Sequence, residues 1–174
     1  PLYVSVQVEV AWGLLTGGST PTFVGIAQDR ADFPFITALG LSSYPYLGGF
    51  TDPSQVPNDY FARLAGASLP PVLVTEGGWS SASVGAVHSS PALQAAWIRR
   101  AASLLDAAKA VAWFQLDFTD LDLAAFGLPP DDPQVVQFTR IGLVDTALAP
   151  KPSLAVWDSV LALPHYQQLS STSR

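Results

Sequence analysis

The chain has 174 residues and a net charge of −6, and it is 49% apolar but only 13% charged, where an average soluble domain is roughly 25% charged. The acidic balance argues against nucleic acid, the lack of cysteine excludes disulfides and thiolate metal sites, and no apolar run approaches the ~20 residues of a membrane-spanning helix. The few charges leave apolar surface that we expect to meet another piece of protein.

Four apolar segments predict β-strands. They cover residues 2–10, 35–47, 71–75 and 111–116. The first segment alternates and is rich in β-branched residues, which is typical of a strand. The second breaks at Tyr44-Pro45.

Three segments predict helices. They cover residues 54–65, 91–110 and 151–163. Gly66 is expected to cap the first helix at its C-terminus, and Ser90-Pro91 gives the second an N-cap followed by proline at the first helical position. Trp97 and Trp157 fall at helical core spacing, so we assign them to packing.

Strands that alternate with helices indicate βαβ units and a parallel sheet. No repeat or linker divides the chain, so we expect one domain over residues 1–168 and a disordered tail over residues 169–174. The polar stretch 117–140 follows the end of a strand, which is the functional edge of parallel α/β proteins.

The predicted strand ends carry a carboxylate among aromatic rings, amides and hydroxyls. These residues are Gln7 and Glu9; Ser43, Tyr44 and Tyr46; Glu76 and Trp79; and Trp113, Gln115 and Asp117. Aromatic faces stack on the C–H faces of sugars, while the polar groups hydrogen-bond sugar hydroxyls. The residue types therefore indicate a sugar site.

Four motifs, in order, resemble the clan A glycoside hydrolases, which are retaining (β/α)8-barrel enzymes. "VLVTEGGWSS" resembles their seventh-strand motif, in which a glutamate ends the strand as nucleophile. "LGLSSYPYL" is similar to the sixth strand with its Tyr-Pro pair, "VAWFQLDFTD" to the eighth strand with its sugar-platform tryptophan, and "GLVDTALAPKPSLAVW" to the closing stretch.

The resemblance implies that the chain is strands five to eight, the C-terminal half of a (β/α)8 (TIM) barrel, and a piece of something longer. An open, doubly wound sheet is the alternative fold. The family's acid/base glutamate follows an asparagine at the end of strand four, and "Asn-Glu" does not occur in this sequence. We therefore expect the acid/base on another segment, and the isolated fragment to be inactive on ordinary substrates.

The resemblance also implies a role for each site residue. Retaining hydrolysis uses two carboxyl groups ~5–5.5 Å apart, and Glu76 would be the nucleophile, kept ionised by a hydrogen bond from Tyr44. Trp79 and Trp113 would wall the site. Further substrate contacts would come from Tyr44, Tyr46, Asp117 and Gln7. No cofactor and no metal are expected.

Structural interpretations stay open beside these roles. Glu76 could be a solvated loop carboxylate, Tyr44-Pro45 a simple turn, and Trp113 a core residue. Glu9 is interpreted as a structural or substrate-contact residue rather than a catalyst. The alternative function is a non-catalytic carbohydrate-binding or structural half-barrel module.

The remaining polar residues predict no second chemistry. His88 and His165 have no partner at metal spacing and are expected at the surface. The acidic run of Asp117, Asp120 and Asp122 lacks the glycine and glutamate of an EF-hand, so we expect loop solvation. The serines of "WSSAS" lack a histidine or oxyanion motif, and "TGGST" lacks the lysine of a phosphate loop.

The expected partners are an oligo- or polysaccharide substrate and either the missing N-terminal half-barrel or a second copy of the chain. No nucleic-acid or membrane partner is expected. For a polysaccharide hydrolase, an extracellular or periplasmic location is favoured.

Overall fold

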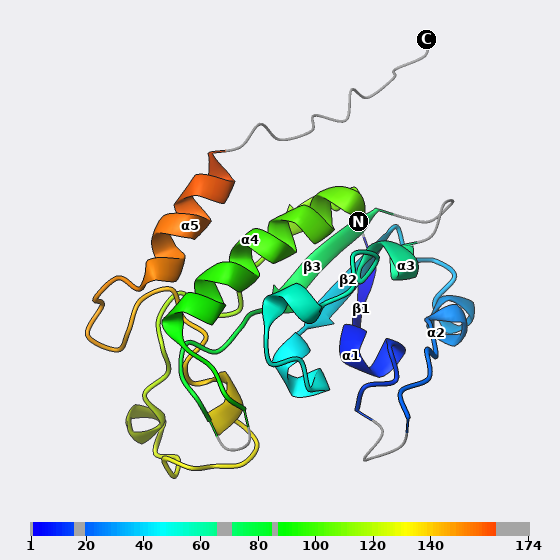
Figure 1. Ribbon diagram of the computed structural model, residues 1–174. Coiled ribbons are helices and arrows are strands. Elements are labelled where there is room, and N and C mark those ends of the chain that lie inside the picture. Colours follow the sequence, from blue (N-terminus) through cyan, green and yellow to red (C-terminus); the bar gives the residue numbers. More distant parts are fainter. Residues whose placement is uncertain (1, 16–19, 66–70, 85–86, 163–174) are drawn as a thin grey trace.

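The computed structural model describes residues 2–15, 20–65, 71–84 and 87–162, and within them the chain forms a four-stranded parallel sheet in the order β1-β2-β3-β4 (Figure 1). The strands are β1 Tyr3–Gln7, β2 Ala38–Ser43, β3 Val72–Gly77 and β4 Ala112–Trp113. Each strand pairs with the next one in sequence, so all four carboxyl ends lie at one edge. The parallel α/β fold predicted from the sequence is confirmed.

Helices connect the strands. The α-helices are α1 Val8–Ala11, α2 Ala27–Asp32, α3 Ala62–Ala65, α4 Pro91–Ala107 and α5 Pro152–Leu161. Short 3-10 helices are η1 Pro45–Gly48, η2 Pro53–Gln55, η3 Leu123–Phe126 and η4 Val136–Phe138. The predicted cap of α4 is present, because the Ser90 side chain accepts a hydrogen bond from the Leu93 N–H and Pro91 opens the helix.

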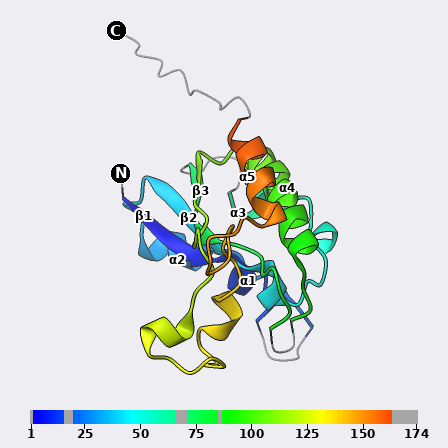
Figure 2. The same ribbon diagram turned by 90° about the vertical axis from the view of Figure 1, so that its left-hand side faces the viewer.

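The main core lies between the sheet and α4. Leu39, Leu41, Val72 and Val74 of the central strands pack with Trp97 and Leu104 of α4. A smaller cluster joins α4 to α5. Figure 2 shows α4 and α5 together on one side of the sheet, with β1 and β2 away from them. The core positions of Trp97 and Trp157 agree with the predicted packing.

The opposite face of the sheet carries small and polar side chains. The hydroxyls of Ser5 and Thr75 share a hydrogen bond of 2.6 Å across the face, and a Cβ on Gly40, between them, would lie 2.8 Å from the Thr75 methyl group. Tyr3 is 54% exposed and Phe114 is 55% exposed. A doubly wound sheet has helices on both faces, whereas α3, α4 and α5 here lie on one face, as in a barrel wall.

Three predicted elements differ from the structure. The first strand ends at Gln7, because Val8, Glu9 and Ala11 turn inward together as the buried side of α1. The predicted helix 54–65 is divided into η2 and α3. β4 pairs over only two residues, since the chain then turns toward the segment around Ile141, to whose carbonyl Gln115 donates.

The C-terminal boundary at residue 168, the tail 169–174 and Gly66 lie outside the described residues. No helix in the described part of the chain is both long and apolar enough to cross a bilayer.

Candidate active site at the carboxyl ends of the strands

Glu76 lies near the end of β3, and its side chain is half-buried. The Ser42 hydroxyl of β2 donates a hydrogen bond of 2.5 Å to Glu76 Oε1. This bond fixes the direction in which the carboxyl group points. The segment 120–140 lies beyond this edge of the sheet (Figure 1), so Glu76 stands where strands and long loops meet.

A β-bulge directs Glu76 toward the open face. Leu41 pairs with Val74, but Ser42 pairs with Glu76, so Thr75 is an extra residue in β3. Simple alternation would point Glu76 toward the helices, as it does Val74. The bulge instead brings Thr75 and Glu76 to the same face, which is how bulges re-aim side chains near functional sites.

Glu9 is the most deeply buried carboxyl group of the site, with 0% exposure. Its Oε1 accepts hydrogen bonds from the Tyr60 hydroxyl, the Ser43 hydroxyl and the Tyr44 N–H. Its Oε2 accepts one from the Gln7 amide. Burial raises the pKa of Glu9 above its usual range, and the hydrogen bonds oppose that effect only in part.

The raised pKa of Glu9 predicts a pH-dependent stability. Because the folded pKa lies above the unfolded value, the contribution of Glu9 is fully present below the unfolded pKa and is lost as pH rises through the folded pKa. We expect the free energy of unfolding of the wild type, minus that of Glu9→Gln, to fall as pH rises across this window. The fall should be about 1.4 kcal/mol per unit of pKa difference.

Urea unfolding of both proteins from about pH 4 to about pH 8 measures this difference. A difference that stays flat, or rises with pH, would contradict the prediction.

Tyr44 and Tyr46 are both buried at the strand end, each with 3% exposure. Burial, and after it the charge of Glu76, raises the pKa of the Tyr44 phenol. Tyr44 is therefore close to Glu76, but between these two described residues the structure records no hydrogen bond, and Ser42 takes the predicted place of Tyr44. The Tyr46 hydroxyl donates to the Gln137 carbonyl.

The two tryptophans expected to wall the site are placed elsewhere. Trp79 is 1% exposed, packs against Tyr46 and Trp97, and donates to Ser89. Trp113 pairs with Val74 on the helix side and meets the Trp157 ring at 4.6 Å. Both placements disagree with the predicted sugar contacts, because in each case the indole is taken up by packing.

Gln7 and Asp117 lie at the predicted edge. Gln7 is half-buried beside Ser42 and Glu9. Asp117 is half-buried, and its Oδ2 is a buried oxygen without a partner in the described part of the chain. Burial, and after it the charge of Asp120, raises the pKa of Asp117. Both side chains are close enough to the strand ends to remain candidate substrate contacts.

Sequence reasoning missed a buried ion pair behind the site. Asp120 is not a solvated loop residue: its side chain is 3% exposed and pairs with Lys151, the residue before α5. Lys151 also donates to Ser81 and to the Gly142 carbonyl. A Cβ on Gly142 would lie 2.2 Å from the Thr119 carbonyl carbon, so only glycine permits this contact. Lys151, the lysine of "APKPS", is the sequence feature that could have indicated this ion pair.

The glycines after Glu76 have a packing role. A Cβ on Gly77 would lie 2.7 Å from the Ser43 carbonyl oxygen, and one on Gly78 3.2 Å from the Gln115 amide. These contacts explain the two glycines by close strand and loop packing.

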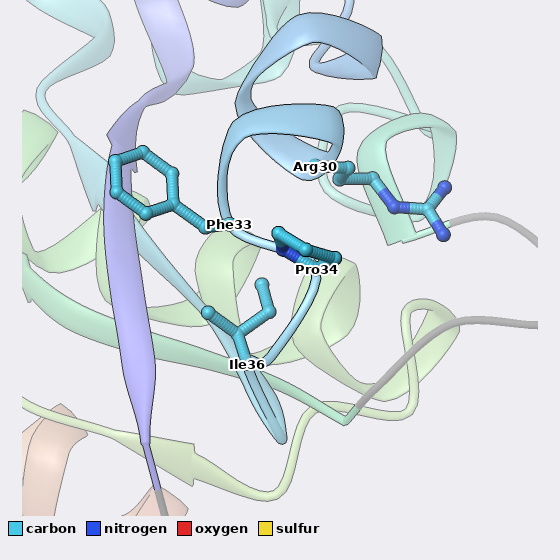
Figure 3. A pocket seen from close by; sticks show the side chains of 4 residues that line it. All are labelled: Arg30, Phe33, Pro34 and Ile36. Carbon is cyan, nitrogen blue, oxygen red and sulfur yellow. The ribbon is translucent and has the colours of Figure 1, made fainter.

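Other candidate sites offer less. His88 is exposed, and His165 and most of "TGGST" lie outside the described residues. No group of three potential metal ligands occurs among the residues that the structure describes. A hollow of about 260 Å³ is lined by Arg30, Phe33, Pro34 and Ile36 (Figure 3). It precedes β2, at the sheet edge opposite Glu76.

Comparisons with known proteins place the fold among glycoside hydrolases. No family model and no curated protein matches the chain. A thermostable mutant of a xylanase from Cellvibrio japonicus aligns with 92% of this chain and 49% of its own, at 13% identity and a TM-score of 0.57. The GH53 catalytic domain from Ignisphaera aggregans aligns with 91% of this chain and 46% of its own, at 16% identity and a TM-score of 0.56.

A β-glucuronidase from an uncultured Clostridium species aligns with 74% of this chain and 23% of its own, at 16% identity and a TM-score of 0.54. These neighbours are (β/α)8-barrel glycosidases, and the chain spans half or less of each. At such identities the likeness shows the fold alone, which is that of part of a barrel.

Proposed function

We propose that this chain is the nucleophile-bearing part of a retaining clan A glycoside hydrolase that cleaves β-linked oligo- or polysaccharides. The observation that supports it most is the half-buried Glu76, turned by a bulge to the open face and hydrogen-bonded by Ser42. A xylanase and a β-glucuronidase among the structural neighbours are consistent with this substrate class.

The chemistry assigned to Glu76 is attack on the anomeric carbon. Its ionised carboxyl group forms a C–O bond to the sugar as the bond to the leaving oxygen breaks, and water later hydrolyses the glycosyl ester. A nucleophile must be charged and held in place. The Ser42 hydrogen bond and the place of Glu76 near the end of β3 hold its carboxyl group in position.

The leaving-group acid is assigned to a segment outside this chain. Glu9 has no exposed surface and accepts four hydrogen bonds, so a leaving oxygen has no access to it. With the acid/base on further β/α units, a substrate with a poor leaving group needs the complete barrel, because general acid assistance contributes about 10²–10⁴-fold.

A mechanism-based inactivator tests the proposal. An activated 2-fluoro-glycoside, whose leaving group needs no proton, should transfer its sugar to Glu76 in the reconstituted barrel, and peptide mass spectrometry locates the label. Glu76→Gln should take up none. Label on any other residue would remove Glu76 from the mechanism, and no label from a panel of β-glycosides would favour a non-catalytic role.

A non-catalytic half-barrel module is the second candidate. It is favoured by the two indoles, because Trp79 is enclosed and Trp113 faces α5, so neither offers a ring face beside Glu76. This candidate predicts that oligosaccharide binding, if present, is unchanged by Glu76→Ala, and that no sugar becomes covalently attached.

We also propose that further β/α units cover the open face of the sheet, and that a second copy of the chain does so when the chain is alone. In the described residues β1 and β4 each pair on one side only, and such edges attract other strands. The exposed rings of Tyr3 and Phe114 lie on the open face.

Light scattering across a concentration series should therefore show a mass above the 18.4 kDa of one chain. Tyr3→Lys with Phe114→Lys should give the single-chain mass. The control is Phe126→Lys in η3, a ring that is 68% exposed away from the sheet. A wild type that stays monomeric, or a control with the same effect, would count against this partner.

A further inference from the structure

Two of the predicted sugar contacts are anchored on one buried carboxyl group. The Gln7 amide donates to Glu9 Oε2 at 2.6 Å, and the Tyr44 N–H donates to Glu9 Oε1 at 2.9 Å. Gln7 ends β1 and Tyr44 follows β2. Glu9 therefore ties together the ends of the two strands that precede β3.

Glu9 itself is held by further hydrogen bonds and by close packing. Oε1 also accepts hydrogen bonds from Tyr60 at 2.8 Å and from Ser43 at 3.1 Å. A Cβ on Gly48 would lie 3.3 Å from the Glu9 Cγ. Three donors thus occupy Oε1, and among the described side chains Gln7 donates to Oε2.

This arrangement determines which end of the Gln7 amide faces the site. Because Gln7 Nε2 points at Glu9, Gln7 Oε1 points toward Ser42 and lies 3.4 Å from its hydroxyl oxygen. The Ser42 hydroxyl shares its one proton between two acceptors, strongly with Glu76 Oε1, 2.5 Å away, and weakly with Gln7 Oε1. A row of contacts therefore runs from Glu9 through Gln7 and Ser42 to Glu76.

We propose that Glu9 is a positioning residue: through Gln7 and Ser42 it holds the polar groups that orient Glu76. Its effect on the reaction rests on the proposed function, whereas its effect on Gln7 does not. Glu9 touches no substrate in this proposal, in agreement with its complete burial.

The donors and acceptors around Glu9 determine how the Gln7 amide is oriented. Three phenols interact electrostatically with Glu9, those of Tyr60, Tyr44 and Tyr46. Burial raises the pKa of each, so all three are neutral, and the Tyr60 hydroxyl donates to Glu9. Glu9 forms no ion pair in the part of the chain that the structure describes. The Tyr44 N–H can only donate, so the atom in the place of Oε1 must stay an acceptor, and a change in donor or acceptor character at Oε2 is absorbed by Gln7.

Exchange of the two side chains tests this coupling. In Glu9→Gln an amide group meets the Gln7 amide, so Gln7 must rotate. In Gln7→Glu two carboxyl groups meet. The double variant, Gln7→Glu with Glu9→Gln, restores one donor and one acceptor at the same net charge, and again places an acceptor oxygen toward Ser42.

We expect each single variant to slow the labelling of Glu76 by the 2-fluoro-glycoside about tenfold, mainly in the rate at saturation, and the double variant to recover to within about threefold of the wild type. A thermal midpoint within a few degrees of the wild type identifies variants that still fold. A double variant no faster than the slower single variant would overturn the proposal.

A second measurement separates this inference from the proposed function. In the wild type, the Gln7 side-chain amide should give an NMR signal that is protected from hydrogen exchange, and Glu9→Gln should abolish that protection. If no protein is labelled but the signal behaves so, the glycosidase proposal fails and the Glu9–Gln7 coupling stands. If the Gln7 amide exchanges freely in the wild type, the coupling itself is wrong.

Discussion

Replacing Lys151 with methionine should lower the free energy of unfolding by about 3–5 kcal/mol, the cost of removing one partner from a buried ion pair. Asp120 would then lose its nearest cation at a position where its side chain is 3% exposed. Its remaining contacts would be the Gly142 N–H and the more distant, half-exposed Arg140 guanidinium, 3.6 Å away.

The effect should be large because this ion pair joins three separate segments. Lys151 precedes α5, Asp120 follows β4, and Ser81, which also accepts from Lys151, follows β3. Loss of the lysine therefore loosens the loops that surround the carboxyl edge of the sheet. It also leaves the Asp120 carboxyl group without its partner in a poorly solvated site.

Chemical denaturation of Lys151→Met and of a double variant, Lys151→Met with Asp120→Leu, measures the effect. The double variant should recover part of the loss, since it removes the uncompensated charge. Asp106→Asn is the matched control: Asp106 is exposed on α4, and its replacement should change stability by no more than about 0.5 kcal/mol. A Lys151→Met protein as stable as this control would show that the pair contributes little.

Local signals were sufficient for the elements that lie wholly within one apolar segment. β2 and β3 were predicted from apolar runs, and α4 from its apolar spacing with Ser90 and Pro91 at its start. In each case the signal that predicts the element lies in residues close in sequence. The position of Glu76 at a strand end followed from the same reasoning.

The orientation of side chains at the site depended on pairings that the sequence does not display. The bulge at Thr75 arises from the register between β2 and β3, and simple alternation along "VLVTEG" gives the wrong face for Glu76. Trp113 faces α5 because its strand pairs with Val74 on the helix side. An indole in an apolar strand has the same pattern whichever face it takes.

The partners of buried polar groups were the second feature that the sequence did not predict. Glu9 was interpreted as structural or as a substrate contact, and its burial is consistent with the first. Its partner Tyr60 lies 51 residues away, and Asp120 lies 31 residues from Lys151. Isolated charges in a polar segment resemble solvated ones, because only the fold brings their partners to them.

Replacing Glu76 with alanine should reduce turnover of an activated β-glycoside by the complete barrel about 10⁴-fold or more, the scale of losing a covalent nucleophile. The variant should still fold, because Glu76 is half-buried and Ser42 is the one described residue that donates a hydrogen bond to its side chain. Steady-state kinetics with an aryl glycoside measures the loss.

The space left by alanine permits a second test, which gives a positive result only if Glu76 is the nucleophile. Azide can enter it, form a C–N bond to the anomeric carbon on the face that Glu76 would have attacked, and displace the aryl oxide, which leaves without a proton. We expect added azide to restore turnover and to yield a glycosyl azide of inverted anomeric configuration. Glu76→Gln, which fills the space, should show no such rescue. Recovery of a product with retained configuration, or equal turnover by wild type and Glu76→Ala, would mean that another group attacks the sugar and that Glu76 only lines the site.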